Sequence, residues 1–388
     1  MRLLILADNY YPLPLANGIC VKSLVESIER YGHQCTVINR MDDGTEVEDT
    51  DSIHSFNCSR HPNYKFPKKT LYKICQLFLY PHIYKRLVDS YYKQLLMEDM
   101  QHVDVILSVC NPIESVLAAL KVKKAYPAIR QIVYNVDTLS DFRIRWIEGV
   151  CCPLWQQKAF KVEKDIFEKA DVVSILCSHK GYYSSVRYTE YKNKFLFQEV
   201  PLLKVNDKRP EGDNGRSIYA GRFYKDFREP SILLNLFRNT SLGLDIYTTS
   251  NYYKSIREST SASDNITVNE YIPEEELNKV MMSSKILVSI GNKSSNMFPS
   301  KTVTYVAMCK PIIHIFHDNI DPVVDYLRNY PDVLFVDLRN SLAKNRALVF
   351  DFCNRQHQPI NPTLIEERYK TSTPEYCACE LLNRINQI

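Results

Sequence analysis

Three cations lie shortly after one short apolar segment in the second half of the chain. Arg222, Lys225 and Arg228 follow residues 217–220, which have the composition of a buried strand, and Gly221 comes first in the intervening loop. A guanidinium group binds phosphate oxygens in pairs, and a lysine ammonium adds a compact point charge. This spacing indicates a diphosphate site, although a solvated basic loop has the same composition.

A second group suited to phosphate comes before a helical stretch at residues 301–308. Ser300 and Lys301 stand at its start, where free backbone amides and the positive end of the helix dipole favour an anion. Ser300 is also a normal N-cap residue. The two roles are compatible, so the stretch is predicted to hold the distal phosphate.

Asn17 and Gly18 lie between a first strand at residues 3–7 and a helix at residues 20–31. A residue without a Cβ lets a phosphate or a sugar approach the backbone closely. An ordinary tight turn into the helix would also explain this glycine. The loop contains no G-x-G-x-x-G string, which argues against a dinucleotide site.

Candidate metal sites lack the context that they would need. Asp49 and Asp51 form a D-x-D string, but it lies in an acidic stretch at residues 41–59 that we expect to be an exposed loop. The paired cysteines have no zinc-site spacing, and His314 and His317 have no evident third ligand. We therefore expect neither a metal nor a cofactor.

Strand and helix patterns alternate twice along the chain, which predicts two Rossmann-like, doubly wound α/β domains facing a cleft. The first domain is placed at residues 1–203 and the second at 216–363, with a polar linker at 204–215. Residues 364–388 are expected to form a helix that packs back across the domains. Ligands of such sheets bind beyond the carboxyl ends of the strands, which is where the candidate residues fall.

Composition limits the classes of protein that remain. The 388 residues are 45% hydrophobic and 24% charged, which is typical of a globular chain. The formal charge of +4 is too small to indicate a nucleic-acid-binding protein. Twelve cysteines without a preceding secretory signal favour a reduced, cytoplasmic protein.

The positive charge is concentrated in residues 60–96, where eight cations and one acid give a local charge of +7. Tyrosines, phenylalanines and leucines lie between them, as in interfacial helices. A solvated helix face is the alternative. We expect peripheral contact with an anionic membrane surface, made mainly by Lys65, Lys68, Lys69, Lys73, Lys85 and Arg86.

Four strings in the chain, taken in order, resemble the retaining glycosyltransferases of family 4, which have two Rossmann-like domains (the GT-B fold). They are LLILADNYYPLPLANGICVKSLVESIERYGHQCTVI, SIYAGRFYKDFREP, NITVNEYIPEEELNKVMMSSKILVSI and MFPSKTVTYVAMCKPIIHI. The last resembles the Pro-Ser-Lys form of the donor-binding helix in bacterial polysaccharide enzymes. The resemblance extends over nearly the whole chain.

This resemblance implies a metal-independent transfer of a sugar, with retention, from a nucleotide-diphosphate sugar to a lipid-linked or polysaccharide acceptor. The second domain would bind the donor, and the first would bind the acceptor through Asn17, Gly18, Asn135 and Asp137. Asp137 matches an acidic position of the family, where it would orient the acceptor hydroxyl, although it could equally cap the next helix. The implied donor site comprises Gly18, Gly221, Arg222, Lys225, Arg228, Asn296, Ser300, Lys301 and Thr304, with Arg222 and Lys225 also assisting catalysis.

The chain departs from the family at two donor positions. Asn296 and Thr304 stand where the family carries glutamates, the second of which usually binds the ribose hydroxyls. A threonine hydroxyl can form a hydrogen bond but cannot supply a charged acceptor pair. A catalytically silent subunit that binds sugar nucleotides or a partner enzyme is therefore the rival hypothesis.

Overall fold

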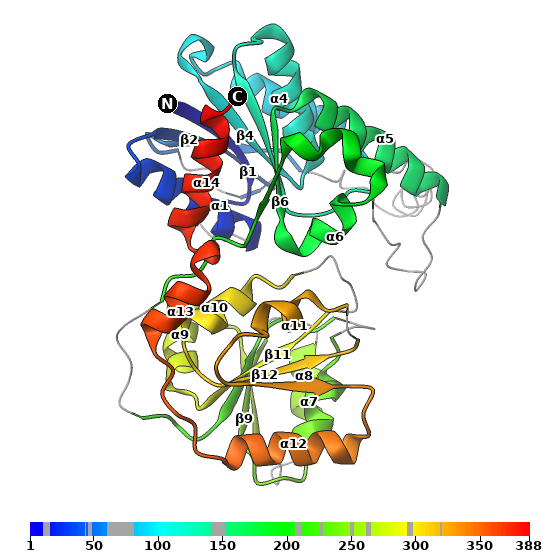
Figure 1. Cartoon of the computed structure of the whole chain (residues 1–388), viewed down its shortest axis with the longest axis vertical. Coiled ribbons are helices and arrows are strands. Elements are labelled where there is room, and N and C mark those ends of the chain that lie inside the picture. Colours follow the sequence, from blue (N-terminus) through cyan, green and yellow to red (C-terminus); the bar gives the residue numbers. More distant parts are fainter. Residues whose placement is uncertain are drawn as a thin grey trace. The chain divides into compact units, whose positions relative to one another are not determined.

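The computed structural model describes residues 1–10, 16–42, 44–45, 49–59, 81–140, 153–205, 212–224, 228–248, 252–260, 265–292, 298–318 and 320–388. The chain divides into two compact units (Figure 1). Unit 1 comprises Met1–Pro201 together with Thr371–Ile388, and unit 2 comprises Leu202–Lys370. The last residues of the chain therefore belong to the first unit.

Unit 1 is built on a parallel sheet with the order β3-β2-β1-β4-β5-β6-β7. Its strands are β1 (Arg2–Asp8), β2 (Gln34–Met41), β3 (Ile53–Asn57), β4 (Val105–Cys110), β5 (Arg130–Asn135), β6 (Val172–Leu176) and β7 (Phe195–Gln198). Its main helices are α1 (Ala16–Arg30), α3 (Lys85–Leu95), α4 (Ile113–Ala125), α5 (Pro153–Lys169), the short α6 (Lys180–Tyr183) and α14 (Pro374–Asn386).

Helices cover both faces of this sheet because alternate residues of its strands point to opposite sides. Leu3 and Ile5 of β1 belong to one buried cluster with residues of α1 and α14. Leu4 and Leu6 belong to another, with residues of α3 and α4. All four leucine and isoleucine side chains are fully buried, which explains why β1 is apolar throughout.

Unit 2 has a second parallel sheet with the order β10-β9-β8-β11-β12-β13. The strands are β8 (Ser217–Ala220), β9 (Leu244–Thr248), β10 (Ile266–Glu270), β11 (Ile286–Ile290), β12 (Ile312–Phe316) and β13 (Val333–Asp337). The helices are α7 (Pro230–Phe237), α8 (Tyr252–Ser259), α9 (Glu274–Ser283), α10 (Lys301–Ala307), α11 (Pro322–Leu327), α12 (Leu342–Asn354) and α13 (Pro362–Arg368).

Both sheets confirm the predicted fold class of two doubly wound parallel-sheet domains. Strand order reverses direction between β1 and β4 in unit 1, and between β8 and β11 in unit 2. In such sheets the loops that follow these paired strands leave toward opposite faces, and ligands usually bind between them. The carboxyl ends of these four strands are therefore the places at which to look for a site.

Three differences between the structure and the sequence prediction concern the acidic stretch, the first helix and the C-terminus. The acidic stretch at residues 41–59 is not simply an exposed loop, because it contains β3, which pairs with β2. The first helix begins at Ala16, so Asn17 and Gly18 lie in its first turn. The C-terminal stretch is two helices, α13 in unit 2 and α14 in unit 1, rather than one helix.

Candidate functional site

The turn after β8 is fixed by hydrogen bonds from both of its sides. Gly221 donates its backbone N–H to the carbonyl of Tyr247 at 3.0 Å, and the Tyr219 hydroxyl donates to the carbonyl of Arg222 at 3.1 Å. A Cβ on Gly221 would lie 3.1 Å from that hydroxyl, which is a tight contact. The glycine therefore lets the chain turn closely over Tyr219, and Arg222 is exposed immediately beyond it.

Arg228 connects the loops that follow β8 and β11. Its backbone pairs with that of Tyr224 through two hydrogen bonds, of 2.9 and 3.1 Å, so the loop folds back on itself. Its Nη2 donates to Oδ1 of Asn292 at 2.7 Å, and Asn292 follows β11. The buried Nε of Arg228 has no hydrogen-bond partner among the described residues. A half-buried cation thus lies at the point where the strand order reverses.

α10 lies close to the same strand end. The backbone N–H of Ala220 donates to the Tyr305 hydroxyl at 3.3 Å, which joins the end of β8 to α10. Burial lowers the pKa of the Lys301 ammonium, and the Glu274 carboxylate partly opposes this shift. Ser300 is the N-cap residue, but its side chain makes no capping hydrogen bond. Thr304 is half-buried on the following turn.

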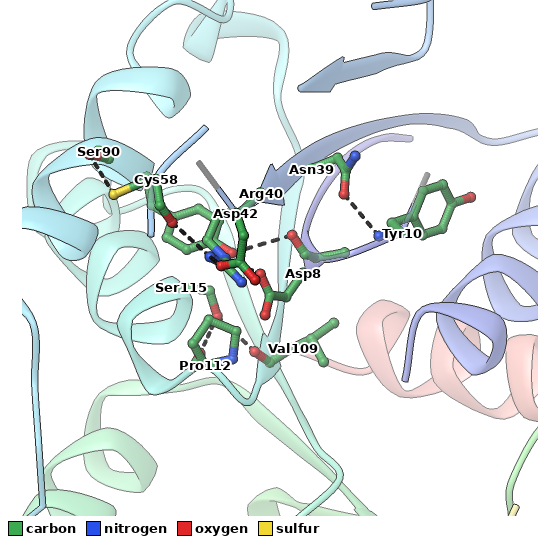
Figure 2. Close-up of polar contacts among 12 residues, drawn as sticks. Asp8, Tyr10, Asn39, Arg40, Asp42, Cys58, Ser90, Val109, Pro112 and Ser115 are labelled. Carbon is green, nitrogen blue, oxygen red and sulfur yellow. Dashed lines mark hydrogen bonds and ion pairs between the residues drawn. The ribbon is translucent and has the colours of Figure 1, made fainter. Parts of the chain in front are cut away.

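Unit 1 carries an ion-pair cluster at the carboxyl ends of β1 and β2 (Figure 2). The Arg40 side chain is 2% exposed and pairs with Asp8 and Asp42, and its Nη1 also donates to the carbonyl of Cys58 at 2.7 Å. Those partners compensate the cost of burying the guanidinium and raise its pKa, against the effect of burial itself. The cluster ties the end of β1 to the segment that follows β3.

The two acceptor candidates at the carboxyl end of β5 have different surroundings. Asp137 is exposed, and its Oδ2 accepts a hydrogen bond of 3.1 Å from the Asn111 side chain, which follows β4. Asn135 is buried and donates to the Tyr183 hydroxyl at 2.9 Å. Asp137 is therefore placed at an accessible sheet edge, whereas the Asn135 side chain is engaged inside unit 1. Neither Asn17, which is half-buried, nor Gly18, which is buried, stands in a loop.

Several predicted residues lie outside the described part of the chain. They are Lys65, Lys68, Lys69, Lys73, Lys225 and Asn296. Lys85 and Arg86 are described, and both are exposed on α3. Within the described residues, no cluster of three metal-ligating side chains occurs, and no helix is long and apolar enough to cross a membrane.

Three polar residues of the strand ends were not identified from the sequence. They are Asn292, Asn111 and Arg40, which join neighbouring loops of the two sheets. Asn111 directly follows the predicted strand at residues 103–110. Asn292 is the second residue after the predicted strand at residues 286–290. A polar residue at the end of a predicted strand was therefore a usable signal for both. Arg40 ends the second strand, but nothing in the sequence shows that it is buried.

The chain was compared with family models, curated proteins and solved structures. Neither the family models nor the curated proteins gave a match. Three solved structures illustrate the likeness in fold. A trehalose-phosphate synthase (UDP-forming) from Burkholderia xenovorans, in complex with glucose-6-phosphate, has a TM-score of 0.61 at 9% identity, with 100% of both chains covered.

The other two are nucleotide-bound glycosyltransferases. An Arabidopsis thaliana UGT complexed with UDP-L-rhamnose has a TM-score of 0.57 at 11% identity, with 99% of this chain and 98% of that chain covered. An alpha-glucosyltransferase in complex with UDP-glucose and DNA containing an abasic site has a TM-score of 0.57 at 12% identity, with 99% of both chains covered. The chain therefore shares the two-domain fold of GT-B glycosyltransferases.

Proposed function

We propose that the chain is a glycosyltransferase that moves a sugar from a nucleotide-diphosphate donor to an acceptor. The observation that carries the proposal is the position of Arg228, a half-buried cation with an unused buried donor at the switch point of unit 2. Arg222 and the partly desolvated Lys301 belong to loops and helices that adjoin the same strand end. Guanidinium and ammonium groups are the side chains that bind the oxygens of a diphosphate.

The cations would act on the leaving group. Negative charge on the donor diphosphate increases as the glycosidic bond breaks, so cations at Arg222, Lys225, Arg228 and Lys301 stabilise the transition state more than the bound donor. Ser300 would add a hydroxyl to the phosphate site, because its side chain makes no capping hydrogen bond to α10. Thr304 and Asn296 would face the nucleotide and its sugar. No metal is required in this mechanism, because the side chains supply the charge.

Unit 1 would bind the acceptor. Asp137 is the accessible carboxylate at its sheet edge and would orient the acceptor hydroxyl, with Asn111 holding it. Asn17 and Gly18 would contribute through the first turn of α1. Because positive charge is concentrated in residues 60–96, we propose a lipid-linked or polysaccharide acceptor at an anionic membrane surface, reached from the cytoplasm, rather than a nucleic acid. We also propose that the transferred sugar retains its anomeric configuration.

Titration calorimetry with UDP tests the phosphate site. Arg228→Ala and Lys301→Ala should each weaken binding by roughly tenfold or more, since a hydrogen bond to a charged group is worth about 1.5–3 kcal/mol. Lys279→Ala is the control, because Lys279 is exposed on α9 and pairs only with Glu275 among the described contacts. Unchanged UDP affinity in both site variants would show that the phosphate assignment is wrong.

The rival proposal is a catalytically silent subunit, favoured by the replacement of two acidic positions by Asn296 and Thr304. The two proposals agree on donor binding and differ on turnover. Release of free UDP from a panel of UDP-sugars, with the product anomer assigned by NMR, separates them. Tight donor binding with neither transfer nor hydrolysis would support the silent subunit.

A further inference from the structure

A groove on unit 1 runs beside α4, and none of the candidate donor-site or acceptor-site residues lines it. Its volume is about 880 Å³, within the range of roughly 300–1,000 Å³ that is usual for ligand pockets. Its lining comes from α3 and the residues just before it, from α4 and Pro127, and from the second half of α5. All of these elements belong to unit 1, so the groove does not depend on how the two units are arranged.

The floor of the groove is apolar. Leu117 and Leu120 of α4 line it and are only partly buried, and Val88 of α3 lies beside them. Ile83 is 37% exposed, and Pro127 is also exposed. Apolar side chains left open along a groove in this way suit an apolar ligand better than a sugar or a nucleotide.

The rim has the opposite character. Five lysines line it against two aspartates, which leaves a local charge of +3: Lys85, Lys121, Lys123, Lys124 and Lys169 against Asp89 and Asp165. Three of the lysines have carboxylate partners, which are Asp89 for Lys121, Asp171 for Lys123 and Asp165 for Lys169. Lys85 and Lys124 are exposed and form no ion pair within the described residues.

An apolar floor beneath a cationic rim matches a molecule with a hydrocarbon chain and an anionic head. We propose that this groove binds an anionic membrane lipid, with its acyl chain along Leu117 and Leu120 and its headgroup at Lys85 and Lys124. Lys85 also belongs to the basic, aromatic stretch at residues 60–96, for which membrane contact is proposed above. The inference deepens that membrane contact and is independent of the donor site.

Two variants separate the head from the chain. The double variant Lys85→Glu/Lys124→Glu removes the charge, and Ile83→Asp places a carboxylate at the apolar mouth of the groove. The matched controls are Lys192→Glu and Val186→Ser, which are exposed positions of the 3-10 helix at residues 186–194 of the same unit. Thermal unfolding of each protein establishes that the substitutions leave the fold intact.

The full chain is tested first with vesicles made of equal parts of phosphatidylglycerol and phosphatidylcholine. The double variant should bind them roughly tenfold less well or worse, and both controls should bind as the parent does. Calorimetry then compares monomeric dihexanoyl phosphatidylglycerol with the free headgroup, glycerophosphoglycerol. The lipid should bind and the headgroup alone should not, and Ile83→Asp should abolish lipid binding.

Equal binding of the headgroup and the lipid would overturn the acyl-chain assignment, as would equal binding to vesicles of phosphatidylcholine alone. Loss of binding in the controls to the same degree as in the site variants would show a diffuse surface effect and would also overturn it. UDP affinity, measured on the same preparations, should be unchanged in the groove variants. A failure of this proposal can therefore be distinguished from a failure of the proposed transferase site.

Discussion

Glu163 is a carboxylate buried inside unit 1 and surrounded by hydroxyl groups. It is 2% exposed, and it accepts hydrogen bonds from Ser140 at 2.5 Å and from Tyr183 and Tyr188 at 2.6 Å each. Burial raises the pKa of Glu163, and the three hydroxyl donors oppose part of that shift. Through Ser140 and Tyr183 it holds the segment that carries the exposed Asp137.

The raised pKa of Glu163 predicts a pH dependence of stability. An unfolded glutamate titrates at about pH 4.3, so between that pH and the higher folded pKa the folded state binds more protons. The contribution of Glu163 to the free energy of unfolding is greatest below about pH 4.3 and decreases as the pH rises through the folded pKa. Glu163→Gln should remove this slope.

Urea unfolding at a series of pH values measures the effect as a difference between the parent and Glu163→Gln. The difference cancels the contributions of exposed carboxylates such as Asp89, whose pKa is lowered and whose effect has the opposite sign. Parallel curves for the two proteins across the acid range would contradict the prediction. Glu190→Gln is the comparison of opposite sign, because a hydrogen bond from Lys164 lowers the pKa of this exposed carboxylate, so its contribution to stability is lost as the pH falls.

Two polar residues at the carboxyl end of β5 show that the sequence does not indicate which side chains are buried. Asn135 and Asp137 are both polar and stand two positions apart at the end of a predicted strand, and the family resemblance favours Asp137 without showing which side chain is accessible. The structure buries the Asn135 side chain against Tyr183 and exposes Asp137. Burial depends on a tyrosine from α6, which is remote in sequence, and no local pattern indicates that contact.

At the scale of elements, Gly291 lets the loop after β11 lie close to Asp321 at the start of α11. It follows β11 and donates its backbone N–H to the carbonyl of Ile315 at 2.8 Å. A Cβ at this position would overlap Oδ2 of Asp321. Asp321 caps α11 by accepting a hydrogen bond of 2.9 Å from the backbone N–H of Val323. Its Oδ2 lies 3.2 Å from Nε2 of His314, and the side chains of Asp321 and His314 are both buried.

Gly291→Ala should therefore destabilise unit 2. The methyl group displaces Asp321, which removes the cap of α11 and leaves His314 without its partner, at a combined cost of about 1–3 kcal/mol. The adjacent Asn292 shifts with the loop, so UDP affinity should also fall. Chemical unfolding and UDP calorimetry check the two effects.

Gly181→Ala is the matched control for this substitution. A Cβ on Gly181 meets no atom within 4 Å, and the residue lies in a helix, where alanine is favoured. This variant should be neutral or slightly more stable than the parent. Equal stability of Gly291→Ala and the parent would show that Asp321 can move aside without cost.

Element patterns predicted most strands of both sheets, including the edge strands β10 and β13, but missed β3 and β7 at the edges of the first sheet. Strands such as β1 and β11 are continuous apolar runs because both of their faces are covered by helices. β3 was missed because an edge strand is only partly buried, and its sequence, IHSFN, follows a run of acids. β7 was missed for the same reason, as it has two half-buried central residues at the opposite edge.

At the scale of the molecule, the chain crosses from unit 2 back to unit 1 near Lys370. The returning helix, α14, packs against α1 and contributes buried residues to the core on one face of the first sheet. Gln198 of β7 donates to the carbonyl of Cys377 at 2.7 Å, which fixes the helix against the edge strand as well. The sequence shows that the C-terminal stretch is amphipathic, but it does not show which apolar surface the helix packs against. That surface is one face of the first sheet, which α14 covers together with α1.

Because α14 belongs to unit 1, we predict that a substitution in α14 lowers the stability of the first sheet and leaves the stability of unit 2 unchanged. Leu381 is fully buried in the cluster that contains Leu3 and Leu24, so Leu381→Ala should cost about 2–5 kcal/mol of unit 1 stability. Native-state hydrogen exchange reads the two units separately: protection should fall in β1 and stay constant in β8. Asn383→Ala, on the exposed face of α14, should change neither. Equal loss of protection in both sheets would show that the units unfold together, because α14 would then stabilise a single cooperative structure rather than unit 1 alone.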